Sequence, residues 1–433
     1  MDPKYHRKHH HHHSHYTRFT LYGWVVCGLA ALFYCYEYLL RIEPSVMMPQ
    51  LMSYFHLKAA GLGFLISMYY YAYTPMQAVV GLTTDYFGPK RILTIAIAVC
   101  IVGVALFAFS SHITVAVSGR LLVGLGSSFA FVGVLKLAAM WLPHNRFAMF
   151  VGLTTALGML GAMVGDVELT SLLGRITWRQ LLNYSALFGV VFLPIFWLFV
   201  SERVDRTRER TGTPQSFRLL ISEFLSLARS KQMWICGLIG CVMYLSLSAF
   251  AELWGIPFVN SLHFATHHFP ADFNSLVFLG WLIGAPLNGW LSDKIKSRRA
   301  ILINHSLIST ILFSIVLYTP MTEFTLASCL FLFGLFSSGQ VLVFVVARES
   351  TSLKSTATAI GFMNLLVMLG GMTVQPLVGL LLDWHWYGVM INNIRVYSMI
   401  DYNRALTIIP IALLVTSMMA FWLKETYGQG QDQ

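Results

Sequence analysis

Long apolar runs fill most of this sequence, and each is long enough to cross a lipid bilayer as a helix. A transmembrane helix needs about 20 consecutive, predominantly apolar residues. Twelve such runs occur, six on each side of one polar stretch; they begin near Leu21, Ala59, Arg91, Ile113, Phe147, Leu182, Met233, Phe273, Ala300, Phe324, Ser355 and Leu406. Because a segment in lipid must satisfy its backbone hydrogen bonds internally, the runs predict an all-α membrane protein with two six-helix bundles.

The composition excludes a water-soluble globular protein. Of the 433 residues, 56% are hydrophobic and 11% are charged, whereas soluble domains contain about 25% charged residues. The net charge of +10 does not indicate nucleic-acid binding, since the basic residues form short clusters between apolar runs and not a patch interleaved with aromatic residues.

The distribution of Lys and Arg predicts the orientation in the membrane. The loops on the side of the two termini hold 21 of the 29 basic residues, and the opposite side holds 6. Cytoplasmic loops of membrane proteins carry an excess of Lys and Arg. We therefore expect a multi-pass protein of the plasma (inner) membrane with both termini in the cytoplasm.

The polar stretch divides the chain into five regions. We expect a His-rich cytoplasmic tail, an N-terminal bundle, a cytoplasmic linker with an amphipathic surface helix, a C-terminal bundle and a short cytoplasmic tail, at residues 1–20, 21–200, 201–232, 233–423 and 424–433. The His-rich tract could bind metal, but a purification tag or a solvated tail is the favoured interpretation. No metal site or cofactor is expected elsewhere, because the six cysteines all lie inside apolar runs without metal-site spacing.

The second half of the sequence repeats the first. The segment GLTTDYFGPKR at Gly81–Arg91 corresponds to GWLSDKIKSRR at Gly289–Arg299, and GLGSS at Gly124–Ser128 corresponds to GLFSS at Gly334–Ser338. The two offsets are 208 and 210 residues. Membrane carriers are commonly built from such related halves, with the substrate held between them.

The repeated segments carry a resemblance to a known family. The residues of the loop between spans two and three resemble the signature loop of the major facilitator superfamily, which recurs between spans eight and nine; they are Gly81, Asp85, Gly88, Lys90 and Arg91, and in the second loop Gly289, Asp293, Lys294, Arg298 and Arg299. The Arg120-x-x-x-Gly124-x-Gly126 segment is similar to a further motif of that family.

The resemblance spans Leu21 to Leu423 and implies that both loops act as conformational latches between two states of the carrier. The alternative is that these charges only fix the topology. The loops depart from the family pattern at Tyr86, Pro89 and Ser297, so each latch is expected to be weaker than in typical members.

Several ionisable residues lie inside the apolar runs: Glu37, Arg41, Arg120, Lys136, Asp166, Glu168 and Glu252. A charge at the centre of a spanning helix costs roughly 2.5–3.5 kcal/mol, so such residues are functional candidates.

We predict that Arg41 and Arg120 bind an anionic group of the substrate and that Glu37 or Glu252 carries a proton. An internal Glu37–Arg41 salt bridge is the competing interpretation, since residues four apart share a helix face. Lys136 is expected to extend to the membrane interface.

Asp166 and Glu168 are expected near the outer surface and exposed there.

Polar side chains at mid-depth are further candidates for the substrate path. Tyr69, Tyr73 and Gln77 share one face of span two, and Gln340, Asn364 and Gln375 occupy spans of the second half. Their hydroxyl and amide groups could bind a solute, although tyrosines that only pack helices together fit the same pattern.

These features predict a secondary active transporter for a small anionic or zwitterionic metabolite such as an organic acid, amino acid or short peptide, working by proton-coupled uptake. The EYLLR segment resembles the first span of organic-anion and sugar-phosphate carriers; YYYAYTPMQ and FAELWGIPF resemble nutrient carriers of intracellular bacteria and, more distantly, the lysosomal dipeptide transporter. The expected partners are the substrate, protons and lipid, with the chain a monomer. No ATP-binding or enzymatic motif is found, so we expect no enzyme activity.

Two alternatives stay open. One is a drug/proton antiporter, which typically carries a Gly-Pro pair in span five; the stretch Gly152–Gly165 has glycines and no proline. The other is a membrane receptor that shares the fold without transporting.

Overall fold

The computed structural model describes residues 7–142, 144–201, 217–264, 268–350 and 356–427. Within these ranges the chain is almost entirely helical. In these described ranges, eleven helices are long and apolar enough to cross a membrane, or twelve if a pair bent by 113° counts as one span. The all-helical membrane fold predicted from the apolar runs is therefore confirmed.

Among the described residues, the first half contains five membrane-spanning helices, or six spans if the bent pair Met48–Phe55 and Ala59–Met76 counts as one. Its elements are α1 (Arg7–Val46), α2 (Met48–Phe55), α3 (Ala59–Met76), α4 (Val80–Phe87), α5 (Pro89–Phe109), α6 (Ile113–Ser127), α7 (Ala130–Trp141), α8 (His144–Val164), the π-helical segment η1 (Gly165–Leu169), α9 (Thr170–Leu173) and α10 (Trp178–Phe199). Helix α1 already begins at Arg7, so helical structure extends into the segment interpreted from sequence as a tail.

The second half repeats this arrangement after a linker helix, α11 (Phe217–Ala228). Its elements are α12 (Lys231–Met243), the π-helical segment η2 (Ser246–Trp254), α13 (Gly255–Ser261), α14 (Pro270–Ile295), α15 (Arg298–Tyr318), α16 (Glu323–Ser337), the 3₁₀ segment η3 (Ser338–Val341), α17 (Leu342–Glu349), α18 (Thr356–His385), strands β1 (Met390–Ile391) and β2 (Ile394–Arg395), α19 (Met399–Leu406), α20 (Ile408–Met419) and η5 (Ala420–Trp422).

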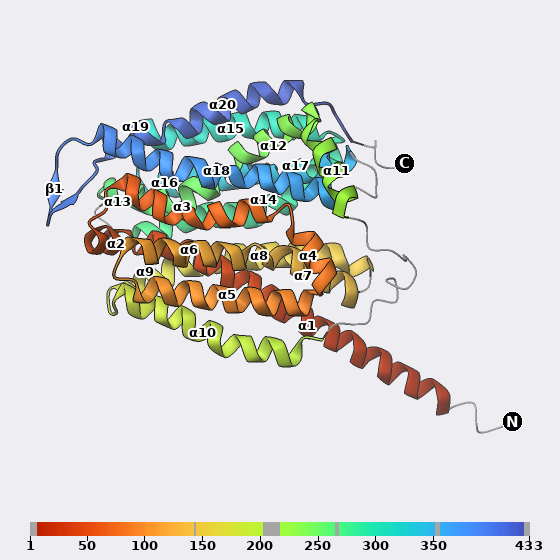
Figure 1. Ribbon diagram of the computed structural model, residues 1–433. Coiled ribbons are helices and arrows are strands. Elements are labelled where there is room, and N and C mark those ends of the chain that lie inside the picture. The colour runs from red at the N-terminus through yellow and green to blue at the C-terminus, as the bar shows by residue number, and fades with distance from the viewer. Residues whose placement is uncertain (1–6, 143, 202–216, 265–267, 351–355, 428–433) are drawn as a thin grey trace.

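The helices run side by side, and both chain ends emerge at the same end of the molecule (Figure 1). We call this end the terminal face. The opposite end carries the antiparallel hairpin of β1 and β2, and we call it the hairpin face. The turn of this hairpin places Asn392 and Asn393 at φ of 50° and 61°, a left-handed conformation that asparagine tolerates better than most residues.

The two halves meet along α3 and α18, which pack against each other over their lengths. Small residues allow this close approach. A Cβ atom added at Gly63 would lie 2.9 Å from the carbonyl oxygen of Gln375, and one added at Gly379 would lie 2.4 Å from that of Ala59. In membranes, where burial of apolar surface does not drive helices together, such backbone contacts are a main source of association.

Glycines also set the packing inside the first half. A Cβ at Gly124 of α6 would lie 2.1 Å from the carbonyl oxygen of Tyr69 in α3. Gly158 and Gly161 of α8 and Gly165 of η1 face α1. The glycine-rich stretch of span five thus serves to bring α8 against α1, the helix that carries Glu37 and Arg41.

We predict that Gly124→Ala destabilises the protein by about 1–3 kcal/mol, the usual cost of overpacking, because the contacting atom is backbone and cannot move aside. Gly28→Ala is the matched control, since a Cβ at Gly28 meets nothing within 4 Å. Thermal unfolding in detergent measures both, and equal transitions for the two variants would contradict the packing described here.

Candidate functional site

A buried ion pair lies in the C-terminal part of α1. Glu37 and Arg41 are four residues apart, and Nη2 of Arg41 is 3.2 Å from Oε1 of Glu37. Their side chains are 0% and 3% exposed. This contact is the one that helical spacing predicts, and it keeps both charges inside the bundle and away from lipid.

Arg41 also reaches the second half of the protein. Its Nη1 is 3.7 Å from Oε1 of Glu252 in η2 and donates a hydrogen bond of 3.3 Å to the hydroxyl of Tyr244. One guanidinium group therefore joins carboxyl groups from both halves. Sequence reasoning named these three ionisable residues, but only the fold brings them together.

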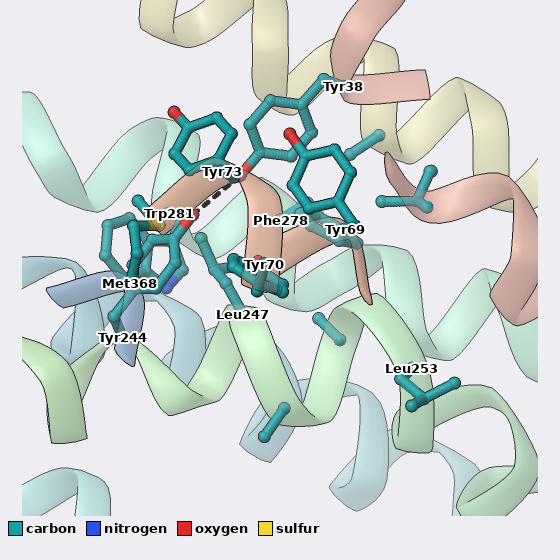
Figure 2. Packing of buried hydrophobic residues seen from close by; sticks show 14 of the residues in the cluster. Tyr38, Tyr69, Tyr70, Tyr73, Tyr244, Leu247, Leu253, Phe278, Trp281 and Met368 are labelled. Atoms are coloured by element: carbon teal, nitrogen blue, oxygen red, sulfur yellow. Dashed lines mark hydrogen bonds between the residues drawn. The ribbon is translucent and has the colours of Figure 1, made fainter. Parts of the chain in front are cut away.

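Tyrosine side chains surround the guanidinium group of Arg41. It lies 4.3 Å from the ring centre of Tyr38 and 5.1 and 5.2 Å from those of Tyr69 and Tyr73. Figure 2 shows these rings together with Tyr244, whose hydroxyl is 3.3 Å from that of Tyr38. Aromatic faces stabilise a cation through their electron density, so the rings compensate for the water that Arg41 has lost.

The tyrosine hydroxyls complete a hydrogen-bond network around the two carboxyl groups. Nε of Arg41 donates to the Tyr69 hydroxyl at 3.0 Å, and that hydroxyl donates to Oε2 of Glu37 at 2.9 Å. The Tyr70 hydroxyl donates to Oε2 of Glu252. We call Glu37, Arg41, Tyr69, Tyr70 and Glu252 the central cluster.

The carboxyl group of Glu252 is only partly satisfied. Its Oε1 has no hydrogen-bond partner among the described residues. The residue lies in a π-helical segment, and π-helical turns frequently occur at functional sites because they displace side chains from the regular helical pattern. Two buried carboxyl groups thus share one guanidinium, and this arrangement can accept one further positive charge.

Arg120 contacts backbone in this conformation. Its Nη1 donates to the carbonyl oxygen of Leu40 at 2.9 Å, and its Nη2 donates to that of Arg41 at 3.3 Å. The side chain is 2% exposed. Arg120 therefore holds α6 against the part of α1 that presents Arg41, although the sequence predicts a direct substrate contact.

The polar candidates at mid-depth make separate contacts, one of them between the two halves. Nδ2 of Asn364 donates to Oε1 of Gln77 at 2.8 Å. Nε2 of Gln375 donates to the carbonyl oxygen of Ser248 at 2.5 Å. Gln340 is buried in η3, and its Nε2 has no partner within the described ranges.

Asp166 does not lie at the surface as the sequence predicts. Its side chain is 0% exposed, whereas Glu168 two residues later is exposed. The reason is that η1 packs against both α1 and α14, so one side of this segment faces the second half of the protein and the other does not.

Two side chains that sequence reasoning missed close the hairpin face. Oδ2 of Asp383, near the end of α18, accepts a hydrogen bond of 2.9 Å from the backbone N–H of Ala60, and the Tyr397 hydroxyl accepts one of 3.0 Å from that of Ala59. These N–H groups open α3 and have no partner within that helix. A carboxylate is stabilised there by the helix dipole, so the second half caps a helix of the first.

The second signature loop contributes Asp293 and Arg298 to a charge cluster on the terminal face. Glu349 of α17 and Glu425 near the end of the chain complete this cluster. Arg298 Nη1 is 2.6 Å from Asp293 Oδ1, and Arg298 Nη2 is 2.9 Å from Glu349 Oε1. Ser297, where the family usually has glycine, accepts a hydrogen bond from the backbone N–H of Ala300 and so caps α15.

The remaining residues of the signature loops take different positions. Lys294 lies over the ring of Trp290 at 4.9 Å, and Arg299 donates to the carbonyl oxygen of Phe421. In the first loop, Gly88 adopts φ of 86° and Lys90 lies 4.3 Å from the ring centre of Trp197. Arg91 and Gly81 are exposed, and Gly289 is half-buried. The side chain of Asp85 lies outside the described part of the structure.

Comparisons with known proteins agree with this architecture. Residues 26–375 match the description of the Major Facilitator Superfamily. A bacterial homologue of the human lysosomal transporter Spinster, in an inward-facing and unoccupied conformation, superposes with a TM-score of 0.75 at 13% identity, covering 93% of this chain and 97% of that one.

Among curated proteins, the chain is 23% identical to the probable sulfoacetate transporter SauU of Cupriavidus necator over 63% of this chain. It is 21% identical to the membrane sensor protein UhpC of Salmonella typhimurium over 82% of this chain and 84% of UhpC. The chain spans 66% of SauU and 41% of an uncharacterized transporter of Bacillus subtilis, less than two thirds of either.

Glu425 of the terminal-face charge cluster provides a test by pH. Burial alone would raise the pKa of this carboxyl, but hydrogen bonds from the Ser297 hydroxyl and from the N–H groups of Arg298, Tyr427 and Arg299 outweigh it and hold the pKa below its usual 4.5. Its contribution to stability should therefore be complete above about pH 4.5 and be lost as the pH falls through the lowered value.

We predict that Glu425→Gln lowers the thermal transition in detergent at neutral pH, by about 1 kcal/mol for lost charge-assisted hydrogen bonds, and that wild type and variant converge in acid. Glu323→Gln, which changes an acidic residue at the start of α16, is the control. A difference between wild type and Glu425→Gln that persists in strong acid would contradict the assignment.

Proposed function

Because this chain belongs to the major facilitator superfamily, we propose that it is a secondary active transporter that takes up a small anionic or zwitterionic metabolite together with protons, by alternating access. The observation that carries the proposal is the position of Arg41, one guanidinium between carboxyl groups of the two halves. The similarity to SauU, a probable sulfoacetate transporter, supports an anionic substrate.

The central cluster suggests how an anion and a proton could be coupled. Arg41 binds carboxylate, sulfonate or phosphate groups well, because its planar fork matches their oxygen atoms. An arriving anion would compete with Glu252 for Arg41. A released Glu252 would be a buried charge without a cation, so it would take up a proton. Substrate and proton would therefore bind together.

The closed arrangement of the site supports alternating access. Glu37, Arg41 and Glu252 are each at most 3% exposed, so a solute can reach them only if the halves separate at one face. In this proposal the contacts of Asp383 and Tyr397 with α3 close the hairpin face, and the terminal face opens to the cytoplasm. The basic residues on the side of the termini favour that orientation.

Each predicted site residue has a proposed role. Arg41 is the anchor, Glu37 and Glu252 hold the transported proton, and Arg120 positions α1. Tyr69 and Tyr73 are proposed to line the substrate path, with Gln77 and Asn364 on its terminal-face side. Gln340 is also proposed to bind the substrate, and this proposal rests on its position in the sequence alone. The residues of the two signature loops are proposed to act as latches whose contacts differ between the two states.

A non-transporting receptor is the second candidate, because UhpC is described as a membrane sensor protein and aligns over most of both chains. A drug/proton antiporter is a third. Proteoliposome flux separates them. Anion uptake driven by an inward proton gradient supports the first, efflux of cationic dyes the antiporter, and binding without flux the receptor.

We predict that Arg41→Lys lowers uptake at least tenfold, roughly 1.4 kcal/mol, because an ammonium group cannot bind two oxygen atoms in the same fork. Substrates for the assay are the small carboxylates, sulfonates and phosphate esters that raise the thermal transition of the purified protein. Arg404→Lys, an exposed position in α19, is the control, and unchanged flux in Arg41→Lys would remove Arg41 as the anchor.

We also predict that Glu252→Gln abolishes uptake driven by a proton gradient but leaves exchange of internal for external substrate. The amide keeps the size of the side chain and cannot bind or release a proton. Flux measured across a range of pH checks this prediction. A pH profile identical to that of wild type would exclude Glu252 as the proton carrier.

A further inference from the structure

Asp166 is a buried acidic residue that the central cluster does not use. It lies in η1, close to the hairpin face, and its side chain is 0% exposed. Oδ2 accepts a hydrogen bond of 2.6 Å from Nδ2 of Asn274 in α14, which belongs to the other half of the protein. Oδ1 has no hydrogen-bond partner among the described residues.

Among the described residues, the groups that contact Asp166 or its segment provide no positive charge. From α1, Leu39 and Ile42 pack on the adjacent Gly165. From α9, the Thr170 hydroxyl donates to the backbone carbonyl of Asp166 at 2.6 Å and leaves the side chain untouched. On α14 the facing group is the neutral amide of Asn274, and Asp272 near the start of that helix instead accepts a hydrogen bond from Phe269 N–H.

The charged group that acts on Asp166 from η2 is Glu252, which is also acidic. On its own segment, Glu168 is exposed. An ionised Asp166 would therefore be a desolvated negative charge that a second acid repels, with one neutral donor. A neutral carboxyl group, which holds a proton, has no such cost in the same position.

Asn274 ties this carboxyl group to the central cluster. Besides Asp166, its Nδ2 donates to the carbonyl oxygen of Ala251 at 2.8 Å, and the next residue along η2 is Glu252. The side-chain amide of Asn274 can occupy this position only because residue 255 is glycine. A Cβ atom at Gly255 would lie 1.9 Å from Oδ1 of Asn274. Only glycine at that position leaves room for an amide that contacts both halves.

We propose that Asp166 and Asn274 form a second proton-binding site, separate from Glu37 and Glu252, and that its proton holds the hairpin face closed. With the proton bound, Asp166 stays dry and accepts from Asn274. When the proton leaves, the carboxylate needs water, which it obtains only if η1 and α14 separate. Opening of the hairpin face is thereby coupled to deprotonation. The role of this step in uptake rests on the proposed function, whereas the coupling itself does not.

The test measures the opening of the hairpin face as a function of pH. Spin labels are attached at Ser171→Cys in α9 and at Asn260→Cys near the end of α13, both exposed positions. Double electron–electron resonance then measures the distance between the labels, which reports the separation of the halves. The six native cysteines are replaced by alanine in a background whose thermal transition matches wild type. Measurements run from about pH 5 to about pH 9, a range over which buried carboxyl groups exchange protons.

With Asp166 intact we expect a longer label distance to gain population as the pH rises. Asp166→Asn should lose this pH dependence and keep the short distance throughout, because an amide of the same shape cannot ionise. Glu168→Gln, the same change of charge two residues away, should behave as wild type. Asn274→Ala removes the donor and should lower the closed population at every pH, which provides a readout if Asp166→Asn does not fold.

The proposal is overturned if the distance is independent of pH in wild type, if Asp166→Asn follows pH as wild type does, or if Na⁺ at fixed pH replaces the effect of protons. The outcome is separable from that of the flux assay. Proton-driven uptake with a pH-independent hairpin face would refute only this site. A hairpin face that follows Asp166 without any flux would refute only the transport function.

Discussion

The arrangement of the two halves depends on the ion pairs that the buried guanidinium of Arg41 makes with Glu37 and Glu252. A positive charge in the interior of a membrane protein persists only where other groups replace its hydration. Here Glu37 supplies one carboxyl group from the same helix, Glu252 supplies another from the second half, and tyrosine rings cover the remaining faces. An ion pair of this kind favours the closed arrangement only while the carboxyl groups are ionised and no other anion takes their place on Arg41.

The contacts between the halves differ in chemistry along the interface. At the hairpin face, Asp383 and Tyr397 cap the first turn of α3, an interaction of a carboxylate and a hydroxyl with backbone N–H groups. In the middle, charged side chains meet, and towards the terminal face the amides of Gln77 and Asn364 meet. Between these polar contacts the helices touch through glycine, as at Gly63 and Gly379. Small residues let the helices approach, and polar side chains supply contacts that can be broken singly.

The sequence was most informative where a physical rule acts locally. Apolar runs of sufficient length had to become helices in lipid, and the spacing of Glu37 and Arg41 placed them on one face. The repeated loops and the match to the superfamily indicated two related halves. Local reasoning failed for Asp166, which is buried because η1 packs on α14. For Arg120 the predicted substrate contact stays a prediction, and the fold adds bonds to backbone carbonyls of α1.

By itself the sequence determined the kind of spanning elements and the set of charges that lipid cannot solvate, because both follow from the free energy of moving a short segment out of water. Only the tertiary structure decided which charges meet. Glu252 is more than 200 positions from Arg41, and Asp383 is still farther from Ala60 along the chain. Contacts of that range depend on how whole helices pack, and packing depends on many small steric terms that no local pattern of residues contains.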